Sequence, residues 1–132
     1  MKDFDLQFDS PDETHFALLG GWRTLTALSV TMFIRSDRQR GAGFPFALSW
    51  STGANANTVL IGAEPFLVSL FNQEMKALPS FSLNDGEWHH LAVVRAANGL
   101  TTVFLDGLLV ATEQMPSTAV VNGYLVLGQE QV

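Results

Sequence analysis

The residues of this 132-residue chain with the clearest capacity for ligand chemistry stand at its C-terminal end. Gln129-Glu130-Gln131 follows the apolar run Tyr124 to Leu127, which is typical of a short β-strand. Calcium prefers six to eight oxygen ligands from carboxylates, side-chain amides and backbone carbonyls. A loop with Glu and Gln side by side at a strand end offers several of these oxygens. Glu130 and Gln131 are therefore candidate calcium ligands, and the alternative is that they form an ordinary polar strand end.

A second candidate is the adjacent pair His89-His90. Neighbouring residues of a strand point to opposite faces of the sheet, so the two imidazoles cannot bind one ion in regular geometry. We expect a structural role instead, with one imidazole hydrogen-bonded within the protein and the preceding Trp88 packed in the core.

The carboxylates do not form the pattern of a hydrolase. Glycoside hydrolysis needs two carboxylates about 5 to 9.5 Å apart across the scissile bond, and alternating acids on one strand would supply them. No Glu-x-Asp-x-Glu run occurs, because Glu64, Glu74, Glu87 and Glu113 are scattered near expected strand ends. A Gly-x-Ser-x-Gly nucleophile elbow is absent as well. The sequence favours a protein that is not an enzyme.

Composition narrows the possible partners. The net charge is −6 and the only basic cluster is Arg35, Arg38 and Arg40, which argues against nucleic acid. Charged residues make up 15% of the chain, below the roughly 25% of typical domains, so we expect apolar outer surface and self-association. There is no cysteine, and no apolar stretch approaches the ~18 residues of a membrane span.

The elements that must position these residues are short strands. Asp85 to Gly107 predicts a β-meander, with two apolar runs around Ala97-Asn98-Gly99 and a second turn at Asp106-Gly107. The segment 27–35 alternates regularly and is expected to be a central strand. Further strands are expected at 4–8, 15–19, 44–51, 58–61, 66–71, 73–78, 108–112 and 124–127. Frequent turns and no helical stripe predict an all-β, antiparallel β-sandwich.

Three motifs in this order resemble the pentraxin domain of the laminin-G and concanavalin A-like superfamily. They are Asp85-Gly-Glu-Trp-His-His, Leu105-Asp106-Gly107 and Leu125-Val-Leu-Gly-Gln-Glu-Gln131. The resemblance implies a concanavalin A-like jelly roll and covers roughly the first two thirds of such a domain. We therefore expect 1–132 to be a single, truncated domain that is incomplete at its C-terminus.

The same resemblance implies a calcium site and a disulfide, and at both places this chain has residues that differ from the family pattern. The family's calcium loop reads Gln-Glu-Gln-Asp, and an Asp-Asn pair from an earlier turn joins it; here Val132 takes the fourth position and Ala56-Asn57 the place of the pair. Calcium is then expected to bind weakly, through Asn57, Glu130 and Gln131. The usual disulfide positions correspond to Thr31 and Ala92.

The function implied is that of a non-catalytic extracellular recognition module in an adhesion receptor, matrix or secreted protein. Its ligand would be a protein or a glycan, and this segment would not insert into a membrane. The rival hypotheses are a carbohydrate-active enzyme on the same fold and an assembly module without a ligand pocket.

Overall fold

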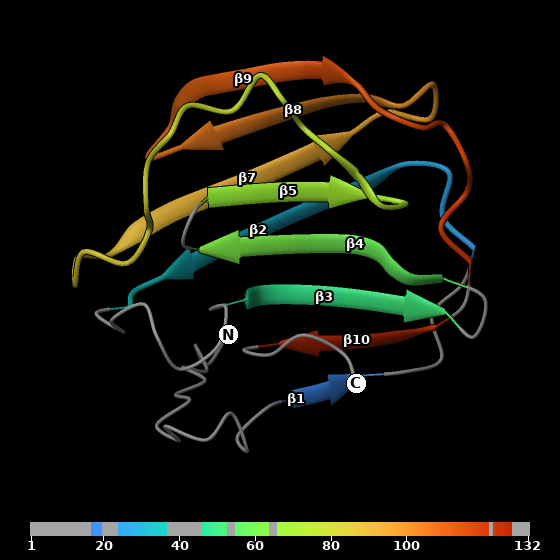
Figure 1. Ribbon diagram of the computed structural model, residues 1–132, viewed down its shortest axis with the longest axis horizontal. Coiled ribbons are helices and arrows are strands. Elements are labelled where there is room, and N and C mark those ends of the chain that lie inside the picture. Colours follow the sequence, from blue (N-terminus) through green and yellow to red (C-terminus); the bar gives the residue numbers. More distant parts are fainter. Residues whose placement is uncertain are drawn as a thin grey trace, which may run out of the picture.

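The computed structural model of the chain is built from β-strands (Figure 1). It describes residues 17–19, 24–36, 46–52, 55–63, 66–121 and 123–127. The strands are β1 (Ala17–Leu19), β2 (Leu28–Ile34), β3 (Phe46–Thr52), β4 (Asn55–Ala63), β5 (Phe66–Leu70), β6 (Gln73–Glu74), β7 (His89–Arg95), β8 (Leu100–Leu105), β9 (Leu108–Gln114) and β10 (Tyr124–Leu127). None of the described segments forms a helix that could cross a membrane.

The strands form two antiparallel sheets that pack on one another, as predicted for a β-sandwich. The larger sheet has the order β1-β10-β3-β4-β5-β6, and the smaller has the order β2-β7-β8-β9. The core between them is apolar and includes Ile61 of β4, Val68 of β5 and Val103 of β8, each fully buried. Burying one such side chain contributes about 1.5 to 3 kcal/mol, so this shared core holds the two layers together.

Two expectations about individual strands are wrong. The segment 27–35 is not central, because β2 is the edge strand of the smaller sheet as far as the described residues go. Its alternation between half-buried and exposed positions is the same in an edge strand as in a central one, so periodicity could not separate the two. The segment 73–78 gives only the two-residue β6: Met75 still donates its N–H to the Val68 carbonyl of β5 and is buried in the core, and the residues after it form a loop. The expected strand at 4–8 lies outside the described residues.

The predicted β-meander is confirmed. Gly99 has a φ of +88° and its N–H donates to the Ala96 carbonyl, which closes the turn between β7 and β8. Asp106 and Gly107 both have positive φ, at 51° and 80°, as a two-residue type I′ hairpin turn requires. These turns bring β7, β8 and β9 side by side in sequence order.

The placement of Trp88 corrects the sequence analysis. Its residue is 58% exposed, whereas Leu91, Val93 and Arg95 of β7 are buried. Trp88 comes just before β7, two residues from His90 and four from Ala92. Residues at this spacing point the same way, so Trp88 faces the outer side of the smaller sheet. Of the two described tryptophans, Trp50 of β3 is the one buried in the core, at 2% exposed.

One long side of the sandwich is closed by the loop between β6 and β7. Met75 and Leu83 of this loop are buried in the core, and the Phe81 ring stacks on Phe66 with the ring centroids 4.7 Å apart. The Glu113 carboxylate of β9 accepts hydrogen bonds from the backbone N–H of Lys76 and of Ala77, at 2.7 and 3.0 Å. These contacts join the loop that follows β6 of one sheet to β9 of the other.

Candidate functional site

Among the described residues, three ionisable side chains meet at the start of β7. His89 is at their centre: its Nδ1 lies 2.9 Å from Asp106 Oδ2, and its Nε2 lies 3.1 Å from both carboxylate oxygens of Asp85. The meander explains the grouping, since the turn between β8 and β9 carries Asp106 back beside β7. Asp106 Oδ1 also accepts the backbone N–H of His90 at 2.8 Å. One carboxylate therefore holds both the side chain and the backbone of the His89-His90 pair.

The electrostatics favour a protonated histidine between two carboxylates. The pKa of His89 is raised, first by its hydrogen bond with Asp106 and then by Asp85, while burial opposes the rise. The pKa of Asp106 is lowered by His89 and by the His90 N–H. The pKa of Asp85 is lowered first by the Glu87 N–H and then by His89. Both imidazole nitrogens are thus engaged by carboxylates, which suits a structural clamp better than a general base or a metal ligand.

His90 points away from this cluster. Its ring packs on Phe33 of β2, with the centroids 4.8 Å apart and the planes tilted by 45°. The two imidazoles lie on opposite sides of β7, so the expectation that they cannot share one ion is confirmed. Sequence reasoning missed Asp85 and Asp106 as the partners of His89. Both precede a glycine, and that signal was interpreted only as turn chemistry.

The described residues do not test the predicted calcium site as a whole. Asn57 stands in β4, and Glu130 and Gln131 lie outside the described residues. β10 ends at Leu127, which pairs with Leu48 of β3, and Leu48 pairs with Ile61 of β4. Ile61 is four residues from Asn57, or roughly 13 Å along the strand. Among the described residues there is no group of three or more His, Asp or Glu that could hold a metal ion.

Sequence reasoning also missed the role of Arg95 at the end of β7. It is 2% exposed, and its guanidinium donates to three backbone carbonyls. Nη2 lies 2.6 Å from the Pro116 oxygen and 2.7 Å from that of Thr118, and Nη1 lies 3.1 Å from that of Thr26. Burial lowers the pKa of Arg95. The side chain ties the segment after β9 and the segment before β2 to the sandwich, so its role is structural.

The two packed antiparallel sheets define the chain as a β-sandwich domain of the concanavalin A-like class. The chain belongs to the laminin G family described as the "Concanavalin A-like lectin/glucanases superfamily", whose model matches residues 12–132. Within that superfamily its relatives identify it as a pentraxin-type domain, which confirms the resemblance inferred from the sequence.

Two human proteins illustrate the relationship. The chain is 32% identical to human neuronal pentraxin-2 over 114 residues, which are 81% of this chain and 26% of that protein. It is 33% identical to human neuronal pentraxin-1 over 112 residues, which are 80% of this chain and 25% of that protein. The chain thus spans about a quarter of the length of the curated relatives it matches.

Solved structures show the same fold at low sequence identity. A heptameric SAP-like pentraxin from Limulus polyphemus gives a TM-score of 0.57 at 17% identity, covering 88% of this chain and 64% of the other. The mouse laminin alpha1 domains LG4-5 give a TM-score of 0.63 at 15% identity, covering 89% and 32%. The full extracellular region of zebrafish Gpr126/Adgrg6 gives 0.63 at 14% identity, covering 80% and 15%.

Proposed function

We propose that this domain is a non-catalytic extracellular recognition module that binds a protein or glycan ligand, as part of an adhesion receptor, matrix or secreted protein. The observation that carries the proposal is the structural use of the groups that catalysis would need. Both nitrogens of His89 are bound to carboxylates, His90 packs on Phe33, and Glu113 accepts two backbone N–H groups. The family and the extracellular origin of one structural relative support the same role.

The test is binding without turnover. The purified domain is passed over immobilised glycans and over extracellular matrix proteins, and the same glycans are incubated with it and analysed for cleavage products. Saturable binding with the ligand recovered intact is the expected result. Cleavage products that disappear when a single Glu is changed to Gln would overturn the proposal in favour of a glycoside hydrolase.

In this proposal calcium binds weakly, with Asn57, Glu130 and Gln131 as its ligands. The three side chains offer one carboxylate and two amides, a small share of the six to eight oxygens and of the negative charge that calcium prefers. The chain after Leu127 would also have to reverse to approach Asn57 at the other end of β4. Titration calorimetry with calcium should therefore give weak binding, reduced further in Glu130→Gln. A tight site that survives Glu130→Gln would contradict this ligand set.

We further propose that residues 1–132 act as one pentraxin-type domain, since a single family match covers residues 12–132. Limited proteolysis tests the single domain: one protected fragment is expected, and two separable fragments would contradict it.

An assembly role is the second candidate function. It is favoured by the exposed apolar side chains of the smaller sheet, among them Phe33 at 73% and Leu109 at 62% exposed.

A further inference from the structure

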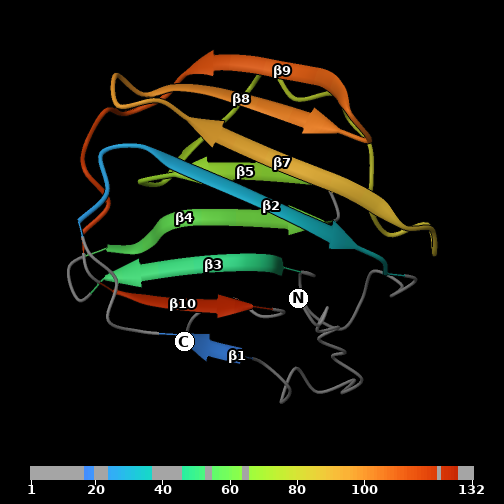
Figure 2. The same ribbon diagram turned by 180° about the vertical axis from the view of Figure 1, so that it is seen from behind.

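Residues 84–88, which lead into β7 and which we call the latch, are held to the rest of the domain by two contacts. The Gly86 N–H donates to the Ser36 carbonyl, just after β2, at 2.7 Å. The Asp85 carboxylate lies 3.1 Å from Nε2 of His89 through each of its oxygens. Figure 2 shows the latch running into β7 beside the end of β2. The latch thus bridges two strands of the smaller sheet.

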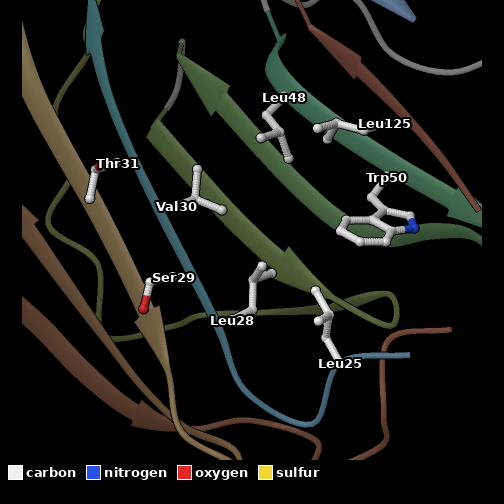
Figure 3. Close-up of a pocket in the computed structure, with 8 residues that line it drawn as sticks. All are labelled: Leu25, Leu28, Ser29, Val30, Thr31, Leu48, Trp50 and Leu125. Carbon is white, nitrogen blue, oxygen red and sulfur yellow. The ribbon is translucent and has the colours of Figure 1, made fainter. Parts of the chain in front are cut away.

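β2 is the fixed side of the first contact. Figure 3 shows its side chains Leu28 and Val30 pointing toward Trp50 of the larger sheet, so the strand is anchored against the core. By contrast, Asp85 and Trp88 of the latch are exposed. Segments with few buried contacts open locally at low cost. A change at these contacts should therefore move the latch and leave β2 in place.

The two carboxylates that face His89 are held unequally. Asp106 lies 2.9 Å from Nδ1, accepts the His90 N–H at 2.8 Å and donates its own N–H to the His90 carbonyl at 2.8 Å. Apart from His89, Asp85 accepts the Glu87 N–H of the latch itself, at 3.0 Å. Asp106 is therefore fixed to β7, whereas Asp85 can move together with the latch.

The proton on His89 decides whether both carboxylates can be held. An imidazolium donates from both ring nitrogens, but a neutral imidazole has one N–H and one lone pair. When the proton is lost, the remaining N–H stays on Nδ1 beside the fixed Asp106. The lone pair of Nε2 then faces both oxygens of Asp85. Acceptors that face each other repel, so the contact that held the latch becomes unfavourable.

We propose that the latch is a pH-operated device, which is closed onto the domain while His89 carries its second proton and opens when His89 loses it. Opening separates Asp85 from His89 and weakens the contact of Gly86 with the chain after β2. It also lets the exposed indole of Trp88, at the end of the latch, change position. The sandwich itself stays folded, so this is a local transition, and it is independent of the ligand proposed above.

The surrounding charges set the direction of the switch. The pKa of His89 is raised, first by its hydrogen bond with Asp106 and also by Asp85, while burial opposes the rise. The latch is therefore closed below the ordinary value of 6.5 and opens as the pH rises through the higher folded value. The charged groups of the elements around His89 are Asp85 and Glu87 on the latch, Asp106 on the turn between β8 and β9, His90 on β7, and Arg35 after β2.

Amide hydrogen exchange by NMR, corrected for the intrinsic rate at each pH, tests the latch over about pH 5.5 to 8.5. Gly99 is the internal control for Gly86, because both are turn glycines, with φ of 88° and 86°, and Gly99 donates to Ala96 at the other end of β7. Protection of Gly86 should fall at least about fivefold relative to Gly99 as a charge-assisted hydrogen bond is lost. The midpoint should coincide with the pKa measured from the His89 ring resonances.

Two substitutions on the latch separate the switch from a general effect of charge. Asp85→Asn should abolish the pH step of Gly86, because the amide can turn its NH₂ group toward the lone pair of neutral His89. Glu87→Gln removes the same charge two residues away and should leave the step unchanged within about twofold. Cooperative unfolding establishes that each variant is folded.

Three results would overturn the proposal. They are a protection ratio of Gly86 to Gly99 that does not depend on pH, a step whose midpoint departs from the pKa of His89, and a step that survives in a folded Asp85→Asn. If Asp85→Asn fails to fold, the first two measurements on the parent chain still decide the matter. None of these results bears on ligand recognition, which is tested separately.

Discussion

Thr31 of β2 and Ala92 of β7 stand directly opposite each other in the antiparallel ladder. They are the two positions at which the pentraxin resemblance places a disulfide, and this chain has no cysteine. Direct cross-strand neighbours have Cβ atoms about 4.5 to 5.5 Å apart, close to the separation that a disulfide needs. The backbone at these two positions would therefore suit a disulfide, although the residues there are Thr and Ala.

Restoring the pair should stabilise the domain. Thr31→Cys with Ala92→Cys would close a loop of about 60 residues, for which chain entropy predicts up to about 4 kcal/mol of stabilisation. The expected result is spontaneous oxidation and a higher thermal midpoint that falls back on reduction. Each single-cysteine variant is the control. A double variant whose midpoint is unaffected by a reducing agent would show that the two strands do not pair in this register.

Removal of Arg95 should be strongly destabilising. Arg95→Ala leaves the carbonyls of Pro116, Thr118 and Thr26 without the donors that satisfy them, and a buried acceptor without a partner costs about 1 to 3 kcal/mol. We expect a loss of about 3 kcal/mol or more in urea unfolding. Arg35→Ala, at an exposed position, is the control and should change stability by less than about 0.5 kcal/mol. Equal effects of the two substitutions would contradict the assignment.

Truncation of Trp50 should destabilise the domain much more than truncation of Trp88, the residue that the sequence analysis expected in the core. Trp50→Ala removes a buried ring and should cost about 3 to 5 kcal/mol. Trp88→Ala removes a ring that is 58% exposed and should cost about 1 kcal/mol or less. Chemical denaturation of both variants measures the difference. Iodide should quench the fluorescence of Trp88 and leave that of Trp50 largely unaffected.

The ion cluster makes stability depend on pH in two directions. The folded-state pKa of His89 is raised, so its contribution is complete below the ordinary value of 6.5 and is lost as the pH rises through the folded value. The pKa values of Asp85 and Asp106 are lowered, so their contribution is complete above 3.8 and is lost as the pH falls through the folded values. Stability from this cluster should therefore be greatest between these two limits.

Asp106→Asn tests the cluster, because the amide oxygen can still accept the His90 N–H while the charge beside His89 is removed. Urea unfolding across a pH series should show the variant losing most stability below pH 6.5, with the difference from the parent chain shrinking above it. NMR titration of the His89 ring should show a lower pKa in the variant. An unchanged His89 pKa would mean that Asp106 does not hold the proton.

The local architecture followed from the sequence because its determinants are local. The alternation around β7, the Asn98-Gly99 and Asp106-Gly107 turns and the opposite faces of His89 and His90 depend on residues a few positions apart. A sandwich of short antiparallel strands follows from those same patterns. The family motifs then placed Thr31 opposite Ala92, which periodicity alone could not do, because register between strands distant in sequence is a long-range property.

Tertiary structure decided which strand face is inside and which of the described strands stand at a sheet edge. Trp88, just before β7, and Leu91, within β7, are both apolar and point to opposite sides, and only the second sheet determines that Leu91 is covered and Trp88 is not. Likewise β2 looks central in sequence, because apolar alternation records a buried face and carries no information about the number of neighbours. The role of Arg95 arises from contacts between segments far apart in the chain. Such contacts depend on how the two layers pack, which no local pattern encodes.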